Sequence, residues 1–183
     1  MSTKMNKLVL LSALMIAIIG TFGTVSAVEP HNLVAGGDQV VGNVTVTNDG
    51  ENISVTFTTT DGWCMTETHL HIANESEDGI PQTKKGNPRP GQFDYSEVHE
   101  PSVTEYTYVI PLDGLSGDVY IAAHAVVRDE GNPIVDDEGN LTFFEESAWG
   151  NDKPFKGKNW AMYSTYTIPP TPTATLPPLS VTE

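Results

Sequence analysis

The chain has 183 residues, of which 24 are acidic and 9 are basic, so its formal net charge is −15. This negative charge disfavours nucleic acid and anionic membranes as partners. The single cysteine, Cys64, excludes an internal disulfide and suits a buried structural thiol.

The N-terminal segment, residues 1–27, has the layout of a secretory signal peptide. Lys4 and Lys7 precede an apolar run over Leu8–Val25, and small residues follow up to Ala27. A retained membrane anchor is the alternative, because the run is about as long as a bilayer span. After cleavage, 7 basic residues would face 24 acidic ones, a formal charge of −17. We expect a secreted or extracellular, cell-surface associated protein without a membrane span in its mature chain.

Residues 28–167 read as one all-β domain. Apolar and hydroxyl residues alternate in its first segments, and Asp49-Gly50 lies between two of them where a hairpin turn is expected. Strands are predicted over Asn43–Thr47, Ile53–Thr60, Trp63–Ala73, Ser102–Leu112, Val119–Val127, Leu141–Trp149 and Asn159–Ile168. This spacing favours an antiparallel β-sandwich, immunoglobulin-like or Greek-key, of about seven to nine strands. A small barrel is the alternative.

Two connections in this domain are long. Asn74–Pro101 carries four prolines, and a stretch of that length without secondary structure either has a function or contains an unrecognised element. Asp129–Asn140 is predicted to be an acidic hairpin loop. Its carboxylates could bind calcium, but calcium is less favoured for this protein than zinc or copper.

The C-terminal tail, residues 168–183, consists mainly of proline, threonine and small residues. Because proline fixes φ and lacks a donor, we expect an extended disordered segment, either an O-glycosylated stalk or simple terminal disorder. Sequons that predict exposed glycosylation sites support the extracellular location: Asn43, Asn52, Asn74 and Asn140.

The segment Thr66–Ile72, TETHLHI, suggests a metal site. In a strand, Glu67, His69 and His71 share one face, and imidazoles two residues apart can converge on one ion. His124, within an apolar strand, and His99, at the end of the long connection, are the candidates to complete the site. Zinc or copper accepts such ligands, with Glu67 as a ligand or a hydrogen-bond acceptor. The alternative is that these histidines are solvent-facing or satisfied by hydrogen bonds in the core.

Further polar and aromatic residues are predicted to line a pocket beside these histidines. Trp63 is expected on the same strand face as Glu67, and aromatic residues combined with carboxylates are typical of binding sites. The set is Trp63, Tyr120, Glu145 and Trp149.

The motifs THLHIA (Thr68–Ala73), YIAAHAVV (Tyr120–Val127) and ESAWG (Glu146–Gly150) resemble a family of uncharacterised secreted prokaryotic proteins that has no assigned activity. A weaker resemblance is to copper/zinc superoxide dismutases and the related chordin-type sandwiches. There, His69 and His71 would match the H-x-H pair and His124 the late-strand histidine. This chain departs from that pattern at Thr68, where those proteins have glycine, and in lacking a disulfide. The resemblance therefore implies the sandwich fold alone.

Taken together, the sequence predicts a secreted or cell-surface β-sandwich that acts as a non-catalytic binding or envelope-associated module, with a His-lined metal site. Its partner would be an unidentified ligand or a component of the cell envelope. A redox metalloenzyme of the superoxide dismutase type on the same histidines is one alternative. A purely structural envelope component is the other.

Overall fold

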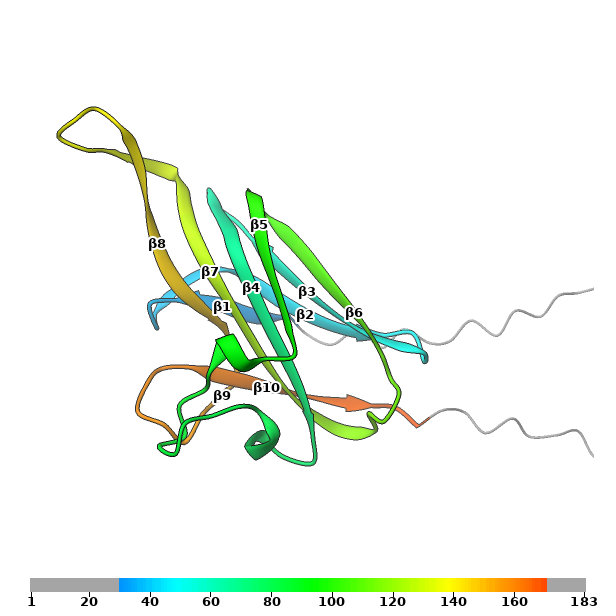
Figure 1. Ribbon diagram of the computed structural model, residues 1–183. Helices are drawn as coiled ribbons and strands as arrows, with labels where there is room; N and C mark the ends of the chain where they lie inside the picture. The colour runs from blue at the N-terminus through cyan, green and yellow to red at the C-terminus, as the bar shows by residue number, and fades with distance from the viewer. Residues whose placement is uncertain (1–29, 171–183) are drawn as a thin grey trace, which may run out of the picture.

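The computed structural model describes residues 30–170 (Figure 1). The predicted signal peptide, residues 1–27, lies outside this range, as does most of the predicted tail. Within residues 30–170, the chain forms no helix with the length and hydrophobicity of a membrane span.

The described residues form an all-β fold, as the sequence predicts, and every strand pairing is antiparallel. The only helical pieces in this range are two single 3₁₀ turns, η1 (Glu77–Gly79) and η2 (Pro90–Gln92). The strands are β1 (His31–Ala35), β2 (Gln39–Asn48), β3 (Asn52–Thr59), β4 (Trp63–Asn74), β5 (Tyr95–Val103), β6 (Glu105–Pro111), β7 (Gly117–Val135), β8 (Leu141–Gly150), β9 (Lys153–Pro154) and β10 (Met162–Ile168).

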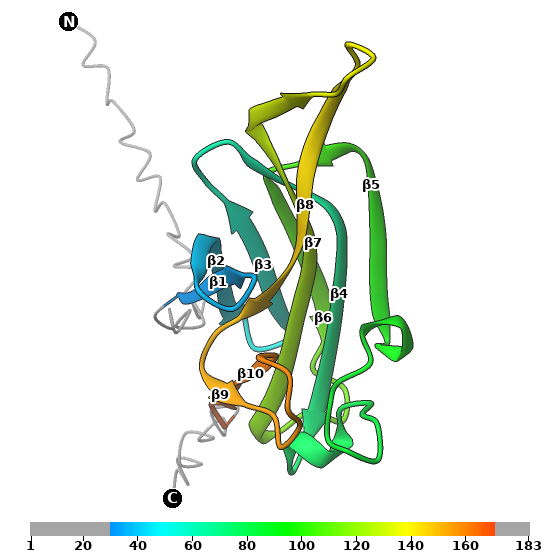
Figure 2. The same ribbon diagram turned by 90° about the vertical axis from the view of Figure 1, so that its left-hand side faces the viewer.

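The strands follow the order β5-β4-β7-β8-β1-β2-β3-β6, and β10 pairs with β7 and with β9. The sheet turns at the short strand β1, so that β2, β3 and β6 lie over β4, β5 and β7 (Figure 2). β4 pairs along one edge of β7, while β8 and β10 share the other edge, β8 at residues 124–135 and β10 at residues 117–121. β7 is therefore the centre of one layer of the sandwich.

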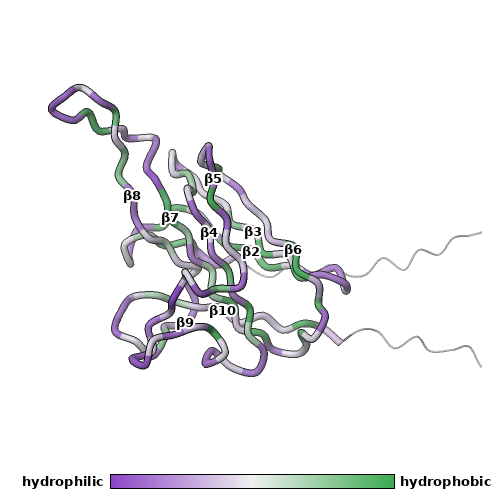
Figure 3. The backbone as a smooth tube through the Cα atoms, viewed as in Figure 1, coloured by the Kyte–Doolittle hydropathy of each residue, from purple (hydrophilic) through white to green (hydrophobic). Residues whose placement is uncertain are grey.

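The core lies between the two layers. It forms because apolar and polar side chains alternate along the strands, so that the apolar ones share the face between the layers. In β3, for example, Ile53, Val55 and Phe57 are fully buried, while the hydroxyl residues between them are partly exposed. The core continues through Leu70 of β4 and Ile121 of β7. The most hydrophobic stretches lie where the strands of the two layers overlap (Figure 3). We call the face of each layer that points into this core its inner face.

Hydrogen bonds between side chains connect the two layers across the core. The Tyr108 hydroxyl on β6 lies 2.9 Å from Thr68 Oγ1 on β4 and donates to the Thr68 carbonyl at 3.1 Å. Asn48 Nδ2 on β2 donates to the Tyr166 hydroxyl on β10 at 2.7 Å. Because buried polar groups without partners are costly, these bonds fix how the layers sit on one another.

The structure differs from the predicted strand pattern in several places. It adds β1 and the two-residue strand β9, and it adds β5 within the long connection Asn74–Pro101. β5 is an edge strand with charged residues and a proline, so it lacks a two-residue hydrophobic period. β7 also continues to Val135, which shortens the predicted loop Asp129–Asn140 to a tight turn.

The bond between the layers can be tested with Tyr108→Phe. This substitution keeps the ring packing but leaves the buried Thr68 groups without the phenol, so we expect a loss of about 1–2 kcal/mol in the free energy of unfolding. Tyr106→Phe is the matched control, because the Tyr106 ring packs against Tyr108 at 4.9 Å without such a bond. Urea denaturation measures both, and equal stability of the two variants would contradict the role of this hydrogen bond.

Candidate functional site

One extra residue in β4 determines which side chains face the core. Met65 lies opposite Val127, but Glu67 lies opposite Val126, so Thr66 is an insertion in the ladder. Met65 points inward before the bulge, and Thr68 points inward after it, both fully buried. Glu67, His69 and His71 therefore point to the opposite side, which we call the outer face.

The bulge also separates Trp63 from the histidines. Trp63 belongs to the core between the layers and packs edge-on against Phe144 at 6.3 Å. The sequence places Trp63 on the same face as Glu67, because simple alternation continues through Thr66. The structure corrects that expectation.

His69 and His124 meet on the outer face and are referred to below as the histidine pair. They are direct partners in the antiparallel ladder between β4 and β7, and their ring centroids lie 5.3 Å apart. Only 8% of His69 and 6% of His124 is exposed. Two imidazoles from separate strands thus share one buried site.

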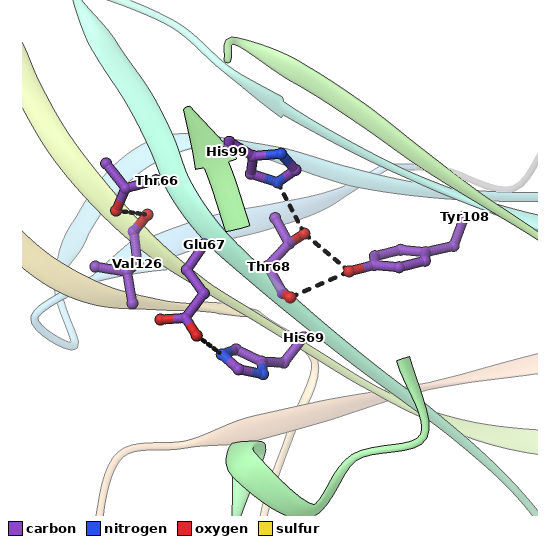
Figure 4. A network of polar contacts seen from close by, with 7 residues as sticks. All are labelled: Thr66, Glu67, Thr68, His69, His99, Tyr108 and Val126. Atoms are coloured by element: carbon purple, nitrogen blue, oxygen red, sulfur yellow. Dashed lines mark hydrogen bonds and ion pairs between the residues drawn. The ribbon is translucent and has the colours of Figure 1, made fainter. Parts of the chain in front are cut away.

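Glu67 orients the first ring of the pair. Its Oε1 lies 3.1 Å from His69 Nε2 (Figure 4). This contact is an ion pair without the alignment of a hydrogen bond. Nδ1 of both His69 and His124 is buried without a hydrogen-bond partner in the described part of the chain. Each ring therefore has an unused nitrogen inside the protein.

The surroundings keep His124 neutral. Burial, with a smaller contribution from His69, lowers the pKa of His124 to about 3. Trp149, its ladder partner on β8, covers the ring at a centroid distance of 4.7 Å. A neutral imidazole is the form that binds a metal ion.

His71 lies on the same face but contacts the long connection instead. Its Nε2 lies 3.2 Å from the Gly79 carbonyl, and its Nδ1 lies 3.2 Å from Asp94 Oδ2. The Asp94 contact is an ion pair without the alignment of a hydrogen bond, which agrees with Nδ1 having no hydrogen-bond partner. Phe93, next to Asp94, packs against the His71 ring at 5.8 Å. His71 thereby holds the connection Glu75–Asp94 on the outer face.

His99 lies on the other side of β4. Its Nε2 is 3.0 Å from Thr68 Oγ1, on the inner face, and its ring packs against Tyr106 at 4.6 Å. Burial lowers the pKa of His99. Figure 4 shows Thr68, Tyr108 and His99 on one side of the strand and Glu67 with His69 on the other. The strand itself separates His99 from the histidine pair.

The remaining predicted pocket residues are dispersed over the outer face. Trp149 covers His124, whereas Tyr120 packs at 6.0 Å against Tyr163. The Glu145 carboxylate is paired with the Arg128 guanidinium at 2.8 Å. Of these residues, only Trp149 contacts the histidine pair.

The four sequons lie at the surface but differ in how their amides are used. The Nδ2 atoms of Asn52, Asn74 and Asn140 donate to Asp49, to the Gly114 carbonyl and to Asp136, respectively. The Asn43 amide oxygen accepts from Thr45, which leaves its nitrogen free within the described residues. Asn43 is nevertheless only partly exposed, whereas Asn74 and Asn140 are exposed.

In the acidic turn, the Asp136 carboxylate is occupied by the turn itself. Asp136 accepts from the backbone of Glu138 and Asn140 and from the Asn140 side chain, and these bonds lower its pKa. Its carboxylate is therefore part of the turn.

Cys64 is partly exposed. Burial, and to a smaller extent the charge of Glu130, raises the pKa of its thiol.

The geometry of the histidine pair can be compared with metal coordination. An imidazole nitrogen binds zinc at about 2.0–2.1 Å, so two imidazoles on one tetrahedral ion place their centroids on the order of 5 Å apart. The observed distance is 5.3 Å. Within residues 30–170, no group of three or more His, Cys, Asp or Glu side chains is arranged to hold an ion. The protein thus offers two imidazoles and an adjacent carboxylate, and other ligands would have to come from outside.

Sequence reasoning missed the partners that decide the role of each histidine. Asp94 and Gly79 come from a connection without periodicity, and Tyr108 reaches Thr68 from the other layer. No local pattern signals these contacts, because each depends on how distant segments pack.

Comparison of the chain with protein-family models, curated proteins and solved structures finds no match. The resemblances noted in the sequence therefore remain expectations.

The neutral state of His124 predicts a pH dependence of stability. The unfolded chain binds a proton on this residue near its ordinary pKa of 6.5, while the folded chain does so only near 3, so stability falls as pH drops through this window. For metal-free protein, His124→Leu should remove about 2.5 kcal/mol of the loss in unfolding free energy between pH 7 and pH 4.5. Denaturation curves at both pH values measure this, with His31→Leu as the control. A loss of the same size in wild type and His124→Leu would refute the assignment.

Proposed function

We propose that this protein is a secreted, non-catalytic binding module that holds one zinc or copper ion at His69 and His124. Secretion is part of this proposal, and the signal-peptide pattern of residues 1–27 supports it. The observation that carries the metal site is the meeting of two buried imidazoles at a centroid distance of 5.3 Å, each with an Nδ1 that has no hydrogen-bond partner in the described part of the chain.

The residues around the pair would have distinct roles. His69 and His124 would supply nitrogen ligands, which both zinc and copper accept. Glu67, whose carboxylate lies 3.1 Å from Nε2 of His69, would fix the ring orientation and polarise the ring through this ion pair. Water or a group from a partner would complete the coordination.

Binding is a better proposal than turnover. Trp149 covers His124 on one side, and Phe93 of the long connection packs against Trp149 at 6.3 Å. This cover favours an ion retained inside the protein over a substrate exchanged at its surface. The redox alternative adds superoxide turnover at the same site, and the copper-loaded protein distinguishes the two.

The metal site is tested by loading metal-free, tag-free protein with zinc or copper. We expect about one ion per chain by elemental analysis, and loss of that ion in both His69→Ala and His124→Ala, since a two-histidine site needs both rings. His31→Ala is the control, because His31 lies in β1 outside the pair. Equal metal content in all four proteins, or none in wild type at millimolar metal, would refute the site.

The role of Glu67 gives a second, graded prediction. Glu67→Gln keeps the size of the side chain but removes the negative charge that polarises His69. Calorimetric titration should show about 10–100-fold weaker binding, the usual effect of changing an outer partner of a ligand. Glu97→Gln, a charge change on the neighbouring strand β5, is the matched control. Affinity unchanged in Glu67→Gln would contradict the role given to this carboxylate.

A further inference from the structure

The hairpin formed by the ends of β7 and β8 projects beyond the other strands (Figure 1 and Figure 2). β4 pairs with β7 only as far as Asp129, and β1 pairs with β8 only from Ala148 onward. Between these points, the two strands pair with each other alone, closing at Val135 opposite Leu141. We call residues 132–144 the arm.

The arm exposes an unusual share of the large hydrophobic side chains. Of the seven that are exposed in the described residues, four lie in it: Ile134, Val135, Leu141 and Phe144, at 49–65% exposure. Val135 and Leu141 form a cross-strand pair on one side of the hairpin, while Ile134 lies on the other. Both sides of the arm are therefore apolar, and Figure 3 shows hydrophobic segments next to a hydrophilic turn.

This exposure needs a physical reason. A two-stranded hairpin is marginally stable alone, and clustered apolar side chains on such an element mark interaction surfaces. Scattered exposed valines elsewhere, such as Val40, Val98 and Val109, need no such explanation.

The charge around the arm indicates the kind of partner. Residues 129–146 contain seven acidic side chains and no lysine or arginine. Two copies meeting through their arms would bring these charges together, and anionic lipid or nucleic acid would be repelled. A partner with an apolar surface bordered by lysine or arginine satisfies both features.

We propose that the arm is a docking element for a protein partner that presents an apolar groove with a basic rim. The apolar side chains on its two sides would be buried in the groove. The acidic turn, including Asp137 and Glu138, would face the basic rim. This interface lies at the end of β7 beyond Asp129, past the segment that carries His124, and does not depend on the metal site.

The experiment uses a fluorescein-labelled amphipathic peptide of leucine and lysine as the probe, with a leucine and glutamate peptide as its counterpart. Anisotropy at physiological salt should show binding of the lysine peptide only. The triple variant Ile134→Thr, Val135→Thr, Leu141→Thr keeps charge and strand propensity, and it should bind at least about tenfold more weakly. The triple variant Val40→Thr, Val98→Thr, Val109→Thr is the matched control and should bind like wild type.

A double variant tests the charge separately. Asp137→Asn with Glu138→Gln leaves the Asp136 turn intact and should weaken binding and reduce its salt dependence. The proposal is overturned if wild type does not bind the lysine peptide, or if both triple variants bind equally. It is also overturned if wild type forms a dimer, or sediments with neutral phosphatidylcholine vesicles, and the arm variant does neither.

Discussion

The extra residue Thr66 in β4 is the constraint on which the arrangement of this protein depends. Met65 faces the core before it, and uninterrupted alternation would then turn Glu67, His69 and His71 inward among leucine and isoleucine. A carboxylate and two imidazoles buried there would cost several kcal/mol. The bulge moves these polar side chains to the outer face and gives the core Thr68, Leu70 and Ile72 instead.

The same strand consequently separates two polar clusters of different character. On the inner face, Tyr108 and His99 both bond to Thr68, as expected of a structural network that joins two layers. On the outer face, His69 and His124 each keep a nitrogen that has no hydrogen-bond partner within residues 30–170. A buried polar atom without a partner needs an explanation, and a bound ion supplies one. This contrast is why the metal proposal rests on the outer pair and leaves His99 out.

Local periodicity was enough to predict the all-β class, the sharing of one face by Glu67, His69 and His71, and several strands of the sandwich. It could not predict which histidines meet, because the pairing of His69 with His124 depends on the register between distant strands. β5 was missed because a charged edge strand has no two-residue period. The extension of β7 was missed because Gly131, Asn132 and Pro133 have the composition of a turn.

The most direct test of this account is the imidazole nitrogen spectrum of ¹⁵N-histidine-labelled protein, recorded before and after addition of zinc. In metal-free protein, His69 faces Glu67 through Nε2 at 3.1 Å. Zinc should then shift the nitrogen resonances of His69 and His124 and leave those of His71 and His99 in place. Shifts confined to His71 or His99, or no shift in any buried histidine, would contradict it.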